Sequence, residues 1–289
     1  MMASEHPDDR GRDLGSLLKA VQRSKKHADV CPEVILRIGQ RELVVRGNVR
    51  DAIKSTKRKL HQVGAAYLQG RPRYARWLAS LRETGGDPVE TRRVCREIMA
   101  AHASTRERLP ILDRFYAETL ADLPPISSLL DLACGYNPLA IPWMPLAPGA
   151  RYAAIDIYVA LAEFLGEALA ILGTDGVSEA RDVLGPQPFP RAPADEDTPR
   201  AGRYDVALLL KAVPCLEQIE RAGGLPLLQS IPARHVLVTF PVQSLGGRDV
   251  QMRANYSARF AELVAAERWS VARHSFETEL AFLVDKGDD

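Results

Sequence analysis

The sequence predicts an α/β protein in which a mostly parallel sheet, covered by helices, follows a helical N-terminal part. Three observations lead to this prediction. Up to residue 125 the apolar residues recur at helical spacing, from residue 126 short apolar strands alternate with helices, and the net charge changes sign at the same place. A chain of 289 residues is long enough for two such parts. We therefore predict two domains, residues 1–125 and residues 126–289.

The first domain consists of stretches with recognisable helix starts. Helices are expected over residues 14–29, 48–68, 73–82, 87–101 and 104–120. Asn48, Asp87 and Ser104 begin three of these stretches and are residue types that cap a helix N-terminus with a side-chain oxygen. Residues 33–45 fit a helix and a strand equally well.

The second domain has the alternating pattern of a layered sheet. Strands are expected over residues 128–133, 152–157, 177–182, 204–210, 234–240, 270–275 and 278–284. The strands over residues 204–210 and 234–240 are almost wholly apolar, which is typical of central strands covered on both faces. The strands over residues 270–275 and 278–284 are expected to form a hairpin. A helix over residues 158–172 links the second and third strands, and residues 185–203, with five prolines, are expected to form a surface loop.

The distribution of charge indicates a polyanion-binding part. The whole chain carries a net charge of +1. Residues 1–125, however, hold 24 basic and 16 acidic side chains, whereas residues 126–289 hold the remaining 14 basic and 21 acidic side chains. Between Gly11 and Arg82 there are 17 basic and only 5 acidic residues. Phosphate neutralisation dominates affinity for nucleic acid, so this excess favours an RNA or DNA ligand for the N-terminal domain.

Other classes of protein are disfavoured by composition. The N-terminus is polar and acidic, and the longest apolar run is shorter than the roughly 18 to 20 residues of a membrane span. We expect a cytoplasmic protein without membrane attachment. The four cysteines are far apart with no CxxC pair, and the six histidines have no metal-ligand spacing, so we expect neither a disulfide framework nor a metal site.

Three residues lie at or just after the carboxyl ends of successive predicted strands. They are Gly135, Asp156 and Asp182. Ligands of open parallel sheets bind at this edge, where a glycine permits close approach and a carboxylate can hold ribose hydroxyls or an adenine amine. The first turn reads CGYNP and lacks the further glycines of a pyrophosphate-binding loop. An adenosine cofactor without phosphate, S-adenosylmethionine, therefore fits best.

Four segments carry a resemblance to a known family. They are HASTRERLP (residues 102–110), LDLACGYNPL (residues 130–139), LLLKAVPCLE (residues 208–217) and FPVQSLGG (residues 240–247). Together they resemble the aminoglycoside-resistance methyltransferases that modify N7 of guanine 1405 in 16S ribosomal RNA, and the branch found in aminoglycoside-producing actinomycetes is the most similar. The likeness extends from about Lys54 to the end of the chain. It implies a Rossmann-like class I fold that uses S-adenosylmethionine, with an N-terminal helical extension that binds RNA.

The resemblance also implies roles for individual residues. Arg108 would meet the carboxylate of the methionine moiety, Gly135 would lie under the cofactor, Asp156 would hold the ribose, and Asp182 with Val183 would read the adenine. The full cofactor-binding set is Tyr67, His102, Ser104, Arg108, Ala133, Gly135, Asp156, Ile157, Asp182, Val183 and Leu210. Leu210 and Lys211 would border the target base.

The RNA-binding set is Lys25, Lys26, Arg50, Lys54, Lys57, Arg58, Lys59, Arg71, Arg248, Met252 and Arg253. Five of these, from Arg50 to Lys59, recur at spacings of three and four and so form a stripe along one predicted helix. The expected partner is 16S ribosomal RNA within the assembled 30S subunit, and we expect the enzyme to act as a monomer.

The chemistry requires no general base, since N7 of guanine has an in-plane lone pair and no proton to lose. Three alternatives stay open on the sequence alone. They are a methyltransferase for another ribosomal base such as adenine N1, a catalytically silent RNA-binding assembly factor, and a methyltransferase for small molecules.

Overall fold

The computed structural model describes residues 7–65, 72–186, 189–190, 202–220, 223–242 and 249–287. Within these ranges the chain forms one seven-stranded sheet with the order β3-β2-β1-β4-β5-β7-β6. The strands are β1 (Ile126–Leu132), β2 (Leu146–Asp156), β3 (Asp175–Ala180), β4 (Tyr204–Leu210), β5 (Ala233–Pro241), β6 (Ser270–Ser275) and β7 (Glu279–Asp285). Strands β1 to β5 are parallel, and β7 runs antiparallel to both β5 and β6. The predicted α/β class and the C-terminal hairpin are confirmed.

Most strand boundaries lie close to the predicted ones. Strand β4 and strand β6 cover the predicted residues, while β2 begins at Leu146, six residues earlier than expected. The early part of β2 contains Pro148 and Gly149, so it lacks the apolar alternation that would have marked it. Strands β4 and β5 are central and buried on both faces, as their apolar runs predict.

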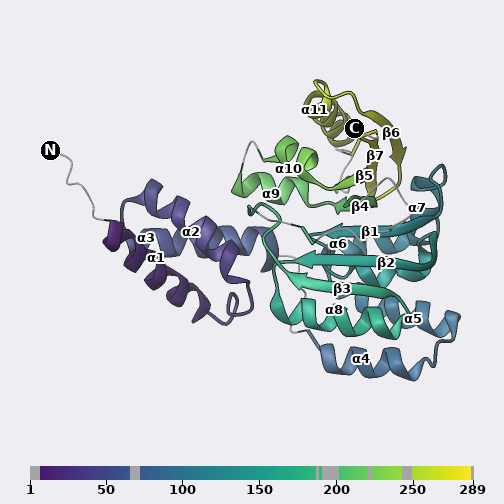
Figure 1. The fold of residues 1–289 in the computed structure, drawn as a ribbon, viewed down its shortest axis with the longest axis horizontal. Helices are drawn as coiled ribbons and strands as arrows, with labels where there is room; N and C mark the ends of the chain where they lie inside the picture. The colour runs from purple at the N-terminus through teal and green to yellow at the C-terminus, as the bar shows by residue number, and fades with distance from the viewer. Residues whose placement is uncertain are drawn as a thin grey trace.

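The two faces of the sheet belong to two separate apolar clusters because side chains alternate along each strand. Leu129 packs with residues of α5 (Pro88–Met99), α7 (Leu112–Thr119) and α8 (Val159–Ile171). Its neighbour Leu130 points to the other face and belongs to the cluster that contains residues of α10 and α11. The helices of this second layer are α9 (Val213–Ile219), α10 (Gly224–Ser230) and α11 (Asp249–Val264). Figure 1 shows the two helical layers on opposite sides of the strands.

Three N-terminal helices form a lobe that we call the arm. They are α1 (Pro7–Gln22), α2 (Pro32–Arg46) and α3 (Val49–Leu60), and a π-helical turn, η1 (His61–Ala65), follows them. The ambiguous stretch 33–45 is helical and lies in α2, between Pro32 in the first turn and Gly47, which ends the helix in a left-handed conformation with φ of 66°. The predicted cap of α3 is confirmed, since Asn48 Oδ1 accepts from the Asp51 N–H at 2.9 Å. In Figure 1 the arm lies beyond the carboxyl ends of β2 and β3.

The remaining N-terminal helices pack on the sheet layer instead of on the arm. Helix α4 (Tyr74–Glu83) covers α8, where Tyr74 stacks on Phe164 with ring centroids 4.8 Å apart. Asp87 caps α5 as predicted, accepting from the Glu90 N–H at 2.8 Å. The prediction that Ser104 caps the next helix is wrong, because α6 (Ala103–Arg108) already includes it and Pro110 then forms a 3-10 turn, η2 (Leu109–Ile111), before α7.

Main-chain hydrogen bonds attach the arm to the end of β2. The Cys31 N–H donates to the Ile157 carbonyl at 2.8 Å, and the Val159 N–H donates to the Asp29 carbonyl at 2.9 Å. The Asp29 carboxylate accepts from the Ala160 N–H at 2.9 Å, at the start of α8. The connection between α1 and α2 is therefore paired with the residues that directly follow Asp156. None of the helices in the described part of the chain combines the length and apolarity needed to span a bilayer.

Candidate functional site

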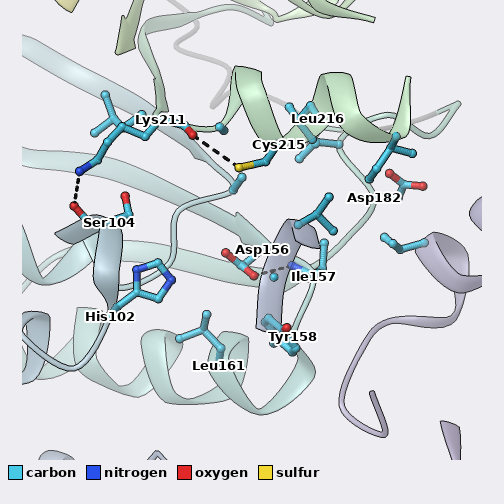
Figure 2. Close-up of a pocket in the computed structure, with 18 of the residues that line it drawn as sticks. His102, Ser104, Asp156, Ile157, Tyr158, Leu161, Asp182, Lys211, Cys215 and Leu216 are labelled. Carbon is cyan, nitrogen blue, oxygen red and sulfur yellow. Dashed lines mark hydrogen bonds between the residues drawn. The ribbon is translucent and has the colours of Figure 1, made fainter. Parts of the chain in front are cut away.

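A cavity lies where the carboxyl ends of β1, β2 and β4 meet the arm. The expected cofactor-binding and target-base residues that line it are His102, Ser104, Ala133, Asp156, Ile157, Asp182, Val183, Leu210 and Lys211. Figure 2 shows how several of them surround the same space, with Asp156 and Ile157 near its centre. Tyr67 lies outside the described residues. Residues far apart in the sequence thus meet at the edge of the sheet that the strand order predicts.

The Asp156 carboxylate is held in place by backbone donors. Its Oδ2 accepts from the Gly135 N–H at 2.9 Å and its Oδ1 accepts from the Ile157 N–H at 2.7 Å. Burial raises the pKa of Asp156, while these N–H groups act in the opposite direction. Because a carboxylate offers about four acceptor positions, Asp156 can still accept from hydroxyl groups of a ligand.

Gly135 does not line the cavity itself, and a side chain at this position would be strained. Its φ is +52°, and an added Cβ would come within 2.8 Å of the His102 ring. The His102 imidazole therefore occupies the space that a side chain at this turn would need. Burial lowers the pKa of His102 to about 4, with further contributions from Lys211 and Arg108. The imidazole is neutral at pH 7 and adds no positive charge to the cavity.

The lowered pKa of His102 predicts a specific acid sensitivity. The folded protein holds this imidazole neutral down to about pH 4, whereas the ordinary value is 6.5. The unfolded chain therefore binds the proton first, and the stability that this residue contributes is present above about pH 6.5 and lost as the pH falls toward 4. Urea unfolding of the wild type and His102→Gln at pH 7.5 and pH 5 will measure it. The variant should lose less stability on acidification, and equal losses would contradict the assignment.

Asp182 is engaged by an arginine that the sequence did not single out. Its carboxylate accepts two hydrogen bonds from Arg37 of α2, from Nε at 2.5 Å and from Nη2 at 2.9 Å. Oδ1 also accepts from the Leu184 N–H at 3.0 Å. Arg37 lines the same cavity. No sequence signal identified it, because residues 33–45 fitted a helix and a strand equally and their partner lies 145 residues away.

Lys211 lines the cavity, and its ammonium group has three polar neighbours. Its Nζ donates to the Ser104 carbonyl at 2.6 Å and lies 3.0 Å from Glu107 and 3.2 Å from Glu279. The contacts with Ser104 and Glu107 are hydrogen bonds, and the contact with Glu279 is an ion pair. Figure 2 shows the side chain running toward Ser104. In this arrangement Lys211 links the end of β4 to α6 and so orders the wall of the cavity.

In the part of the chain that the structure describes, two residues other than glycine adopt left-handed backbone conformations, and both line the cavity. Ala133 has φ of 51° after β1, and Lys211 has φ of 58° after β4. Such conformations cost about 1–3 kcal/mol and persist only where the surroundings impose them. Such residues are often found at ligand-binding sites, which agrees with the position of the cavity at this edge of the sheet.

Arg108 does not line the cavity. Its side chain is wholly buried, and its guanidinium donates to Asn137 Oδ1 at 2.7 Å and to Oε2 of the equally buried Glu279 at 3.1 Å, while Nε lies 2.9 Å from Glu279 Oε1. Burial opposes its charge, yet Glu279 holds the pKa of Arg108 above its ordinary value, and Arg108 in turn lowers the pKa of Glu279. In the structure Arg108 therefore forms an internal ion pair, and its contact with a carboxylate of the cofactor stays a prediction.

The expected RNA-binding residues differ in their exposure and in their contacts. Those with exposed side chains on the arm are Lys25, Lys26, Arg50, Lys54 and Arg58, and Lys57 beside them is half-buried. Lys59 instead pairs with the buried Glu42 at 2.8 Å. Arg71 and Arg248 lie outside the described residues, and Met252 is half-buried at the start of α11. Arg253 donates to the carbonyl groups of Phe276 and Glu277 at 2.7 and 3.1 Å, so its guanidinium supports the turn before β7.

Lys54 and Arg58 also line a shallow hollow on the surface of the arm, together with Arg46, Asp51 and Ser55. Three cationic side chains and a hydroxyl around one hollow provide suitable donors for a phosphate group.

Within the described ranges, no group of three or more His, Cys, Asp or Glu side chains is arranged to hold a metal ion.

Comparisons with known proteins agree with this geometry. The family model described as ribosomal RNA methyltransferase (FmrO) matches residues 23–283. A relative from Micromonospora rosea, named 16S rRNA (guanine(1405)-N(7))-methyltransferase, is 37% identical over 99% of this chain and 100% of its own length. A relative of the same name from Frankia casuarinae is 36% identical over 92% of this chain and 91% of its own.

Solved structures give the same result. The crystal structure of the 16S rRNA methyltransferase RmtF in complex with S-adenosyl-L-homocysteine has a TM-score of 0.77 and 28% identity, and the match covers 95% of this chain and 98% of that one. The 16S rRNA methylase RmtB has a TM-score of 0.73 and 27% identity over the same shares. With nearly its whole length matched by the family model and by full-length relatives, this chain belongs to the FmrO family of ribosomal RNA methyltransferases.

Proposed function

We propose that this protein transfers a methyl group from S-adenosylmethionine to N7 of guanine 1405 of 16S ribosomal RNA in the assembled 30S subunit. The modification would protect the ribosome against aminoglycosides that bind the decoding site. One observation carries the proposal beyond family membership: a cavity with two strand-end carboxylates opens beside a basic, helical arm. A cofactor site and an RNA-binding surface are thereby part of one continuous structure.

The residues of the cavity fit this cofactor. Asp156 has acceptor positions for the two ribose hydroxyls, and Asp182 with the Val183 backbone can read the adenine. At the opposite end His102 and Ser104 leave room for the methionine moiety. Neutral His102 suits a cationic sulfonium, since a protonated imidazole would repel it. When bound, the cofactor supplies an activated methyl group and a good leaving group.

The remaining chemistry is positioning. Guanine N7 attacks with an existing lone pair, so the protein must align it with the methyl group and need not remove a proton. Leu210 and Lys211 border the cavity at the end of β4, where the hydrogen bonds of Lys211 to Ser104 and Glu107 keep that wall rigid. Burial raises the pKa of Cys134 well above its ordinary value, so its thiol stays protonated and takes no part as a nucleophile.

Recognition of the substrate falls to the arm. Its exposed lysines and arginines are suited to phosphate groups of a folded RNA surface, which is recognised mainly by shape and backbone contacts. We further propose that the enzyme acts as a monomer in the cytoplasm, where 30S subunits are assembled.

The direct test of the proposed methyl transfer is incubation of purified 30S subunits with radiolabelled S-adenosylmethionine, followed by mapping of the modified base. Label at guanine 1405 is expected, and label on an adenine or on no base would overturn the proposal.

Charge reversal on the arm should weaken subunit binding without affecting the cofactor site. Lys54→Glu combined with Arg58→Glu removes two cations from the hollow on α3, and we expect at least a tenfold loss of 30S affinity together with a shallower salt dependence. The matched control is Arg268→Glu with Arg273→Glu, which makes the same charge change at exposed positions near the far edge of the sheet. Filter binding across a salt series measures both pairs. Equal losses for the two pairs would show that only net charge matters.

A further inference from the structure

Glu42 of α2 is an acidic side chain buried inside the basic arm. Only 3% of its side chain is exposed, and its carboxylate lies between two cations, with Lys59 Nζ 2.8 Å from Oε1 and Arg46 Nε 3.2 Å from Oε2. Burial opposes the charge, yet hydrogen bonds from Lys59, Ser55 and Arg46 hold the pKa of Glu42 below its ordinary value. Glu42 is therefore a charged group at neutral pH, and its contacts join α2 to α3.

Two guanidinium groups meet at one oxygen atom beside this carboxylate. Arg46 Nη2 of α2 and Arg58 Nη2 of α3 donate to Ser55 Oγ, at 3.4 and 3.3 Å. Groups of like charge repel each other at such separations, and among the described residues no acidic side chain forms an ion pair with Arg58 or Lys54. Arg46, Lys54, Ser55 and Arg58 all line the hollow on the arm. Their convergence favours an anion that the arm itself does not supply.

The contacts of Arg46 determine which of its donors a ligand can reach. Nε and Nη2 face Glu42 and Ser55, so the remaining N–H groups lie on the outer edge of the guanidinium. The side chain is 41% exposed. Glu42 thus holds the inner edge of this fork while the outer edge stays open to a ligand.

We propose that Glu42 is a positioning residue for the RNA substrate: it holds Arg46 and Ser55 so that Arg46, Arg58 and Lys54 together bind one backbone phosphate of 16S ribosomal RNA. Glu42 itself does not touch the phosphate. The inference rests on the proposed binding of ribosomal RNA by the arm, and it adds a buried anion to a surface that otherwise acts through its cations.

The competing explanation is that the arm attracts RNA only through its total charge. The two explanations predict opposite effects for Glu42→Gln, which makes the arm more positive by one charge. If only total charge matters, the variant will bind 30S subunits more tightly. If Glu42 positions the cations, the variant will bind more weakly.

Asp51 provides a matched control because its carboxylate also lies at the hollow. Asp51→Asn makes the same charge change, and its side chain bonds to Asn48 and not to the converging arginines. The cap of α3 is kept, since Asn48 accepts from the backbone N–H of residue 51.

The experiment is filter binding of 30S subunits to the full-length proteins across a salt series. We expect Glu42→Gln to weaken binding about fivefold or more, and the slope of log affinity against log salt to become shallower by about 1, the effect of losing one phosphate contact. Asp51→Asn should bind at least as tightly as the wild type with no shallower slope. In methyl-transfer kinetics the loss in Glu42→Gln should appear in KM for 30S subunits and not in kcat.

The other outcomes count against the assignment. Tighter binding by Glu42→Gln, an unchanged salt slope, or the same loss in Asp51→Asn would overturn it. Thermal unfolding and calorimetry with S-adenosylhomocysteine check that the arm and the cofactor site stay folded. Where Glu42→Gln itself unfolds the arm, Ser55→Ala decides: it keeps every charge and removes the shared oxygen, so weaker binding supports the site and unchanged binding overturns it. Failure of the wild type to bind 30S subunits would instead refute the proposed function.

Discussion

Arg108→Met is expected to lower the free energy of unfolding by about 3 kcal/mol or more, the cost of leaving one member of a buried ion pair without its partner. Both Arg108 and Glu279 are fully buried, so no water can replace the lost guanidinium. Lys211 lies 3.2 Å from Glu279 and partly compensates the charge of this carboxylate. The expected loss of stability is therefore at the lower end of the range that is usual for breaking a buried ion pair. Urea unfolding followed by tryptophan fluorescence at pH 7 measures the change.

A second substitution tests the cause. In the double variant Arg108→Met with Glu279→Gln the buried charge is also removed, so we expect at least half of the lost stability to return. The same proteins distinguish the two roles considered for Arg108. If this arginine binds the carboxylate of the methionine moiety and contributes little to the core, Arg108→Met will unfold like the wild type and lose only affinity for S-adenosylhomocysteine.

Asp156→Ala is expected to weaken S-adenosylhomocysteine binding at least 100-fold. The variant loses the acceptors for two ribose hydroxyls, each hydrogen bond to a charged group contributing about 1.5–3 kcal/mol. It also deprives the Gly135 and Ile157 N–H groups of their partner, so the turn after β1 loses its fixed position. Calorimetry gives the affinity, and binding to 30S subunits should be nearly unchanged because the arm keeps its exposed cations.

The matched control is Asp175→Ala. This carboxylate lies at the opposite end of the sheet, where β3 begins, and is exposed. Its removal should leave cofactor affinity within a factor of about two, as is usual for surface substitutions. An Asp156→Ala protein that still binds within tenfold of the wild type would mean that the ribose is held elsewhere in the cavity.

Much of the cofactor site follows from local sequence patterns. Short apolar runs predict parallel strands, and the rule that ligands bind beyond their carboxyl ends then places Asp156 and Asp182 at one edge. The structure brings both into one cavity, with Gly135 directly behind it. These residues were predictable because each lies at or just after the end of a strand that the sequence marks.

Long-range partners were not predictable in the same way. Arg37 meets Asp182 across 145 positions, and Arg108 meets Glu279 across 171. Neither distance leaves a periodic signal in the sequence. The resemblance marked Arg108 as part of a family segment, yet its burial depends on how α6 packs against β7, which is a property of the assembled fold. Lys59 likewise belongs to the stripe by spacing but turns toward Glu42 of the adjacent helix.

The pairing of residues 29–31 with residues 157–160 has a consequence for protein engineering. We expect that the arm of one relative cannot simply replace the arm of another, because the arm of this protein is hydrogen-bonded to the segment that directly follows Asp156. A hybrid enzyme that joins the arm of one relative to the sheet of another must transfer this segment along with it. Hybrids made without it are expected to lose cofactor affinity even when every residue lining the cavity is retained.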